Sequence, residues 1–134
     1  MTVIDASVYV ALINVHEPGH AACWAWFQRE QARQRPISAP VILLSEVAAV
    51  LSRGMGNPML AHRVVQHLLH AGLVELVPIS LALAQQAAAI AADHRIRGSD
   101  AVYVALAEHL GTELITLDEQ QLERGSAVIT ARRP

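Results

Sequence analysis

The chain begins with a short apolar run, Thr2-Val3-Ile4, which ends at Asp5. Apolar and β-branched residues in so short a run predict a buried strand. The residues 6–13 follow without a turn signal and predict a helix, and the segment 14–19, which contains Pro18, ends it. The chain therefore opens with a strand that passes directly into a helix.

The same alternation continues to the C-terminus. We expect further helices at 20–34, 40–53, 59–71, 81–94 and 100–110, and strands near Ile37 and at 73–79, 113–117 and 127–130. Pro40 is expected to open the helix 40–53, because proline is favoured in the first turn. The expected strands are short, apolar and separated by helices, and no Asn-Gly hairpin signal joins them. This pattern predicts an α/β fold of three layers, α/β/α, with a central parallel sheet.

Length and composition exclude several classes of protein. A chain of 134 residues, of which 53% are hydrophobic and 16% charged, predicts one packed domain spanning 1–134 rather than a disordered regulator. No apolar stretch approaches the roughly 18 residues of a membrane span, and Asp5 stands where a secretory signal is basic, so we expect a cytoplasmic protein with no membrane partner. All ten basic residues are arginine, which excludes P-loop and Schiff-base enzymes because both need a lysine.

The helix expected at 20–34 carries most of the aromatic residues. The spacing of Trp24 and Phe27 predicts that they face the core, whereas Trp26 is expected to point away, and a groove for a partner is the less favoured interpretation. The single cysteine, Cys23, cannot form an internal disulfide and is predicted to be a small buried residue.

Two acidic residues follow predicted strands. Asp5 ends the first strand and Asp118 ends the strand 113–117, so they share one rim if those strands are neighbours in a parallel sheet. Asp100 lies in the first turn of its helix, and Glu46 lies at the edge of an apolar helical stripe. Taken singly, each residue could be a helix cap, a turn former or a solvated charge.

Gathered together, these carboxylates would repel one another unless a cation or a proton offset their charge. An oxygen-only cluster, with no cysteine or histidine at ligand spacing, suits a hard cation such as Mg²⁺ or Mn²⁺.

Four segments carry a family resemblance in their order and spacing. They are Val3-Ile4-Asp5-Ala6-Ser7, Leu44-Ser45-Glu46-Val47-Ala48, Ser99-Asp100-Ala101-Val102-Tyr103, and Leu114-Ile115-Thr116-Leu117-Asp118. Together they resemble the PIN-domain ribonucleases, and most of all the VapC toxins of toxin–antitoxin pairs, over nearly the whole chain.

The resemblance implies a Mg²⁺- or Mn²⁺-dependent endoribonuclease, the toxin of a type II toxin–antitoxin system. It carries the catalytic role to Asp5, Glu46, Asp100 and Asp118, with Asp5, Asp100 and Asp118 as metal ligands. Glu46 is either a ligand or the group that orients the attacking water. Supporting polar roles fall to Ser7 and Thr116, and the choice between Asp118 and Glu119 as the residue facing the metal stays open.

The partners follow from the same resemblance and from composition. We expect an RNA substrate, drawn in part by arginines among residues 29–35 and at 53, 95 and 97. The resemblance implies a cognate antitoxin protein, which lies across the groove at the acidic residues and blocks the site. The high apolar content favours a homodimer. The alternative is a catalytically inactive PIN-like scaffold that binds RNA or a partner. A structure-specific DNA nuclease is disfavoured because the chain is too short for an inserted clamp.

Overall fold

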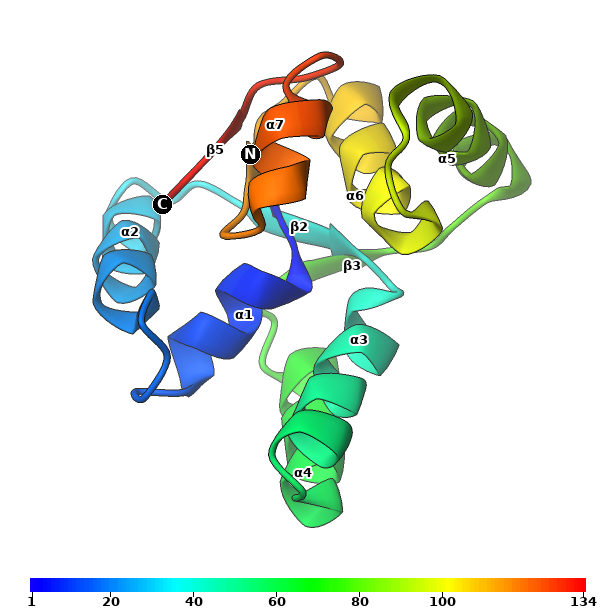
Figure 1. Ribbon diagram of the computed structural model, residues 1–134. Coiled ribbons are helices and arrows are strands. Elements are labelled where there is room, and N and C mark those ends of the chain that lie inside the picture. Colours follow the sequence, from blue (N-terminus) through cyan, green and yellow to red (C-terminus); the bar gives the residue numbers. More distant parts are fainter.

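The computed structural model describes residues 1–134 and contains one five-stranded sheet (Figure 1). The strands are β1 (Thr2–Ile4), β2 (Ile37–Pro40), β3 (Glu75–Val77), β4 (Leu114–Ile115) and β5 (Ala131–Arg132). All neighbouring pairs are parallel, in the order β3-β2-β1-β4-β5. The predicted parallel sheet is confirmed.

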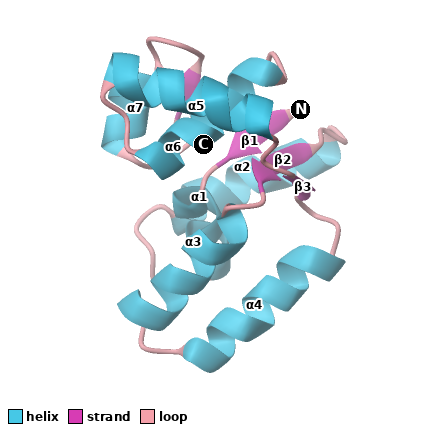
Figure 2. Ribbon diagram, turned by 90° about the vertical axis from the view of Figure 1, so that its right-hand side faces the viewer, coloured by secondary structure: helices cyan, strands magenta, loops and turns pink.

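Seven α-helices connect and cover these strands. They are α1 (Ala6–Ile13), α2 (His20–Ala32), α3 (Leu43–Ala49), α4 (Pro58–His70), α5 (Leu81–His94), α6 (Gly98–His109) and α7 (Glu119–Gly125). In Figure 2, α5 and α7 lie above the strands and α6 lies beside them, whereas α1, α3 and α4 lie below them. Helix α6 packs directly on β1, β2 and β4, and α1 packs against α2 and α3. The predicted three-layer α/β/α architecture is therefore confirmed, and α3 and α4 form an arm that projects from it (Figures 1 and 2).

The strand order contains one switch point. From β1 the chain moves to β2 and β3 on one side, and it then returns to the other side of β1 to form β4 and β5. Val3 is thus paired with Ser38 of β2 on one side and with Leu114 of β4 on the other. In open α/β sheets, ligands bind beyond the carboxyl ends of the strands at such a point, here between β1 and β4.

The core surrounds β1 and α6. All three residues of β1 are buried, and so is an unbroken run of α6 from Tyr103 to Ala107. Helix α3 contributes Leu43 and Val47 from one face. None of the helices combines the length and the apolar character needed to cross a bilayer.

Pro40 does not open a helix, contrary to the prediction. It is the last residue of β2, opposite Val77 of β3, and α3 begins at Leu43. Proline can end a strand as readily as begin a helix, because in both places its missing N–H is not required. The helix also stops earlier than residue 53 and continues as the π-helical turn η1 (Val50–Gly54).

The C-terminal segment differs from the prediction as well. Helix α7 was not predicted, because only seven mostly polar residues form it and Asp118 provides its N-cap. The last strand is β5 at Ala131–Arg132 rather than 127–130. Residues 127–129 instead make turn hydrogen bonds to Arg124 and Gly125, at the end of α7.

The assignment of the two tryptophans in α2 was wrong, whereas Phe27 is partly buried and packs against the core as predicted. Trp26 is 1% exposed and lies in the core, whereas Trp24 is 45% exposed and stacks with Phe27. The buried stripe of α2 is formed by Cys23, Trp26 and Glu30. The prediction for Cys23 is confirmed.

Candidate active site

The four predicted acidic residues each stand at the N-terminal end of a helix. Asp5 caps α1 and Asp118 caps α7, while Glu46 and Asp100 lie in the first turns of α3 and α6. Because the strands are parallel, the helices that follow them begin at the same edge of the sheet, near the switch point between β1 and β4. The positive ends of the helix dipoles favour anions at these positions.

Asp5 is the most constrained of the four. It is 3% exposed, and its carboxylate accepts hydrogen bonds from the Ser7 hydroxyl (2.5 Å), the Thr116 hydroxyl and the Gln121 side-chain amide (2.9 Å). The backbone N–H of Val8 donates a further bond of 3.2 Å, which is the helix cap. The carboxylate is therefore fixed from two ends of the chain.

Ser7 and Thr116 also tie Asp5 to the segment that carries Asp118. The Ser7 hydroxyl accepts a bond from the Leu117 N–H, and the Thr116 hydroxyl accepts one from the Asp118 N–H, both at 3.0 Å. The polar supporting positions expected for these two residues agree with this geometry. They set the position of Asp118 relative to Asp5.

Asp118 and Asp100 are bridged by one guanidinium. Arg97 Nε donates to Asp100 Oδ2 at 2.8 Å, and its terminal Nη2 donates to Asp118 Oδ2 at 3.1 Å. The other oxygen of Asp118 accepts the Gln121 N–H and caps α7. Hydrogen bonding to Asp100, together with the attraction of Asp100 and Asp118, raises the pKa of Arg97 further.

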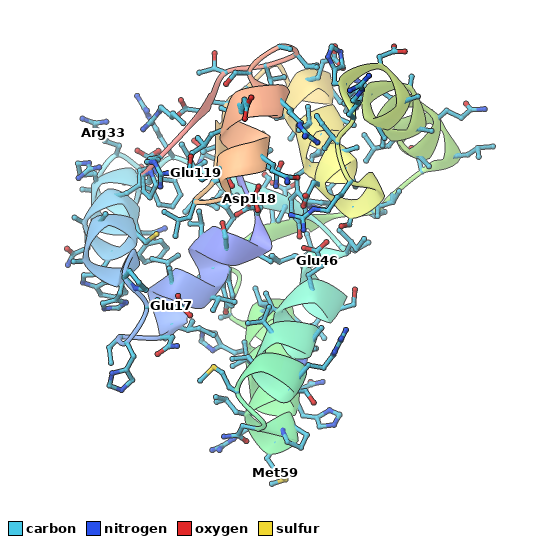
Figure 3. All side chains as sticks on the ribbon, viewed as in Figure 1. Glu17, Arg33, Glu46, Met59, Asp118 and Glu119 are labelled. Carbon is cyan, nitrogen blue, oxygen red and sulfur yellow. The ribbon has the colours of Figure 1, made fainter.

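Glu46 approaches the same region from α3. Tyr103 Oη donates to Glu46 Oε2 at 3.3 Å, and the other oxygen of this carboxylate is buried without a hydrogen-bond partner. Figure 3 shows Glu46 at α3 below the start of α6, and Asp118 at the start of α7.

The carboxylates influence one another's ionisation. Burial raises the pKa of Asp5, Glu46 and Asp100, although hydrogen bonds at each residue oppose the rise. Repulsion from Asp100 raises the pKa of both Asp5 and Glu46, and Asp118 raises that of Asp100. Hydrogen bonds place these acids in one region: Arg97 joins Asp100 to Asp118, and Thr116 joins the Asp118 backbone to Asp5.

Glu119 does not belong to this group. Its side chain is 80% exposed and pairs with Arg133. Of the two adjacent acids, Asp118 faces the cluster and Glu119 faces away, as Figure 3 shows.

The donor set suits a hard divalent cation. All the candidate ligands are carboxylate oxygens, and the buried, unpartnered oxygen of Glu46 leaves an acceptor available. No three His, Cys, Asp or Glu side chains stand close enough to form a metal-holding group in this arrangement, and the positive charge between Asp100 and Asp118 is the Arg97 guanidinium. The carboxylate donor set fits Mg²⁺ or Mn²⁺ by its chemistry, whereas in this arrangement Arg97 is the counter-ion of Asp100 and Asp118.

Sequence reasoning missed three polar residues of the site. Gln121 lies in the unpredicted α7, and Tyr103 sits in a helix whose apolar residues hide its hydroxyl. Arg97 was considered only as a phosphate contact. Its spacing of three residues from Asp100 was a signal, because residues three apart share a helix face.

A separate apolar hollow of about 250 Å³ opens between α1, α2 and the sheet. Tyr9 and Ile13 of α1, Trp24 and Phe27 of α2, and Leu73 line it. Trp24, Ile13 and Leu73 are each at least 39% exposed. The partner-groove interpretation of Trp24 therefore fits the structure better than the core interpretation.

Comparisons with known proteins agree with this architecture. The family model of the PIN domain matches residues 2–126. No curated protein matches the sequence. Among solved structures, VapC20 of Mycobacterium tuberculosis, described as a toxin that cleaves the sarcin-ricin loop, shares 20% identity and superimposes with a TM-score of 0.78 over 100% of both chains.

Two further structures are similar at lower identity. A toxin–antitoxin complex from Klebsiella pneumoniae shares 18% identity with a TM-score of 0.63, covering 91% of this chain and 90% of that one. VapBC2 from Rickettsia felis, bound to a DNA fragment of its promoter, shares 15% with a TM-score of 0.71, covering 99% and 98%. Similarities at these identities show a shared fold.

Proposed function

The chain belongs to the PIN domain family, and on that basis we propose that it is a Mg²⁺- or Mn²⁺-dependent endoribonuclease of the cytoplasm, the toxin of a type II toxin–antitoxin pair. The observation that supports the proposal is the hydrogen-bonded connection of Asp5, Asp118 and Asp100 through Thr116 and Arg97 at the switch point of the sheet, which Glu46 approaches from α3. We further propose that residues 1–134 act as one domain.

In this proposal Asp5, Asp100 and Asp118 hold the cation. When bound there, Mg²⁺ or Mn²⁺ offsets the phosphate charge, acidifies a water molecule and stabilises the leaving oxygen. Ser7, Thr116 and Gln121 keep the Asp5 carboxylate in one orientation. No protein nucleophile is required.

Glu46 has two candidate roles, as a further ligand or as the group that orients the attacking water. Because burial and the neighbouring carboxylates raise its pKa, Glu46 is a better proton acceptor than an exposed glutamate. Tyr103 holds one of its oxygens and leaves the other free for either role.

RNA cleavage by the purified chain tests the proposal. We expect cleavage with Mg²⁺ or Mn²⁺, none with EDTA, and a loss of at least about 100-fold in Asp5→Asn. Asp93→Asn on the exposed face of α5 is the matched control and should cleave normally. Cleavage that survives EDTA or Asp5→Asn would contradict the metal mechanism, whereas RNA binding without cleavage by the wild type would favour the inactive scaffold.

The apolar hollow supports an antitoxin as the protein partner. An amphipathic segment of such a partner could bury its apolar side against Trp24, Phe27 and Leu73. Trp24→Asp is expected to weaken binding of the cognate antitoxin by at least about 10-fold. Calorimetry would measure the affinity, with Leu81→Asp as control because Leu81 is 77% exposed on the distant α5. Equal effects in the two variants would exclude the hollow.

We also propose a homodimer. Apolar side chains remain exposed on the projecting arm, including Val50, Met55, Met59 and Leu69. Sedimentation equilibrium of the chain alone would detect the dimer, and a monomer at micromolar concentration would contradict it.

A further inference from the structure

The Arg97 side chain supplies a positive charge at the acidic site. Its guanidinium is the only group that bridges two of the four carboxylates, by the 2.8 Å bond to Asp100 and the 3.1 Å bond to Asp118. Both of its ion pairs go to proposed metal ligands. Each oxygen it contacts is therefore one that a divalent cation would need.

The backbone explains why Arg97 reaches inward. Arg97 is the N-cap residue of α6 and makes no side-chain capping bond. Its extended backbone (φ −57°, ψ 144°) precedes Gly98, and the side chain is free to cross to the cap of α7. It therefore connects the first turn of α6 with the start of α7.

The surroundings of Arg97 allow it to leave. Its side chain is 64% exposed, whereas those of Asp100 and Asp118 are 13% and 30% exposed. A guanidinium that swings away from the site loses two partly exposed ion pairs and leaves no cavity in the core. Asp118 keeps its capping bond from the Gln121 N–H, and the mostly buried Asp100 remains in the first turn of α6.

We propose that Arg97 is an internal counter-ion that competes with the divalent cation for Asp100 and Asp118. This inference rests on the proposed metal-dependent function. In the metal-free chain Arg97 offsets the repulsion among the carboxylates and stabilises the fold. Binding of the cation displaces the guanidinium, whose charge is then available at the rim of the site.

Calorimetric titration with Mn²⁺, together with thermal unfolding in EDTA, tests this. Arg97→Gln should bind Mn²⁺ roughly three- to tenfold more tightly than the wild type, because two exposed ion pairs no longer compete. In EDTA the same variant should unfold at a lower temperature, since the carboxylates lose their counter-ion. Arg97→Lys keeps the charge but not the forked geometry and should give an intermediate affinity.

The matched control is Arg95→Gln. It removes the same charge two residues away, and the Arg95 side chain makes no hydrogen bond or ion pair, since only its carbonyl accepts one from Arg124. Its Mn²⁺ affinity should stay within about twofold of the wild type, as expected for a screened surface charge. An equal change in Arg95→Gln and Arg97→Gln, or weaker binding by Arg97→Gln, would overturn the inference.

Asp100→Asn separates this inference from the proposed function. Mn²⁺ binding by the wild type but not by Asp100→Asn would support the metal site. If Arg97→Gln and Arg95→Gln then bind Mn²⁺ with the same affinity, the metal site stands and the counter-ion role of Arg97 falls. If neither the wild type nor Arg97→Gln binds Mn²⁺, both fall. Mn²⁺ binding by Arg97→Gln but not by the wild type would support the inference, because Arg97 would then exclude the cation completely from Asp100 and Asp118.

Discussion

Individual hydroxyl groups determine how the acidic residues are held. Thr116 is fully buried, and its single hydroxyl donates to Asp5 while accepting from the Asp118 N–H. One side chain thus links the acid after β1 to the acid after β4. The effect of the Thr116 hydroxyl on stability and cleavage can therefore be measured separately from the effect of the carboxylates.

Thr116→Val should be harmful in two respects. It leaves the buried Asp5 carboxylate short of a donor and the Asp118 N–H without its acceptor, which costs about 1–3 kcal/mol of stability. RNA cleavage should fall by at least about 10-fold because no side chain then holds Asp5 and Asp118 in a fixed position relative to one another. Urea unfolding and single-turnover cleavage measure the two effects. Thr116→Ser retains the hydroxyl and should restore both, and failure to do so would point to packing instead.

The sequence was informative about the acids and less so about their partners. A carboxylate after a strand or in a first helical turn can be read from local pattern, as for Asp5, Asp118 and Asp100, whereas Glu46 was placed only at the edge of an apolar helical stripe and joined to the other three by the family resemblance. Gln121 and Tyr103 carry no such signal, because their importance depends on which carboxylate lies across the fold from them. Long-range partners of this kind come from tertiary structure alone.

At the level of the element, α2 shows why periodicity can mislead. Two stripes of similar spacing run along this helix, one through Trp24 and Phe27 and the other through Cys23, Trp26 and Glu30. The second stripe is buried although it contains the charged residue Glu30. Hydropathy alone predicts that a stripe with a charged residue faces solvent. Pro40 is similar, since the same residue suits the end of β2 and the start of a helix.

The two tryptophans of α2 should therefore differ sharply in their effect on stability. Trp26→Ala removes a side chain that is 1% exposed and should cost about 3–5 kcal/mol. Trp24→Ala should cost less than about 1.5 kcal/mol, because nearly half of that side chain is in solvent. Urea unfolding followed by circular dichroism gives both values. Similar losses would mean that the hollow beside Trp24 is part of the core.

For the molecule as a whole, the sheet edge beyond β4 depends on an ion pair. Arg132 of β5 donates from Nε and Nη2 to the two oxygens of Glu113, at 2.7 and 2.8 Å. This forked pair holds the short strand β5 beside β4, which joins it through few backbone bonds. The fold class, the layers and the position of the sheet were predictable from the sequence, whereas a strand as short as β5 is defined by such tertiary contacts.

The Glu113–Arg132 pair should make stability depend on pH. Hydrogen bonding to Arg132 lowers the pKa of Glu113 below its ordinary value of 4.5. A lowered folded-state pKa adds stability above the ordinary value, and this contribution disappears as pH falls through the lowered one. Thermal unfolding should thus show Glu113→Gln less stable than the wild type at pH 7, with the gap closing as the pH falls below 4.5. Glu123→Gln, which removes an exposed carboxylate with no ion pair, should show no such dependence.

The switch point between β1 and β4 also sets the moment at which activity can arise during synthesis. Thr116 and Gln121, the groups that orient Asp5, are translated more than a hundred positions after it. A growing or prematurely terminated polypeptide thus carries an unassembled and harmless centre. Under the proposed ribonuclease function, this order of assembly would protect the message and the ribosome that are producing the chain.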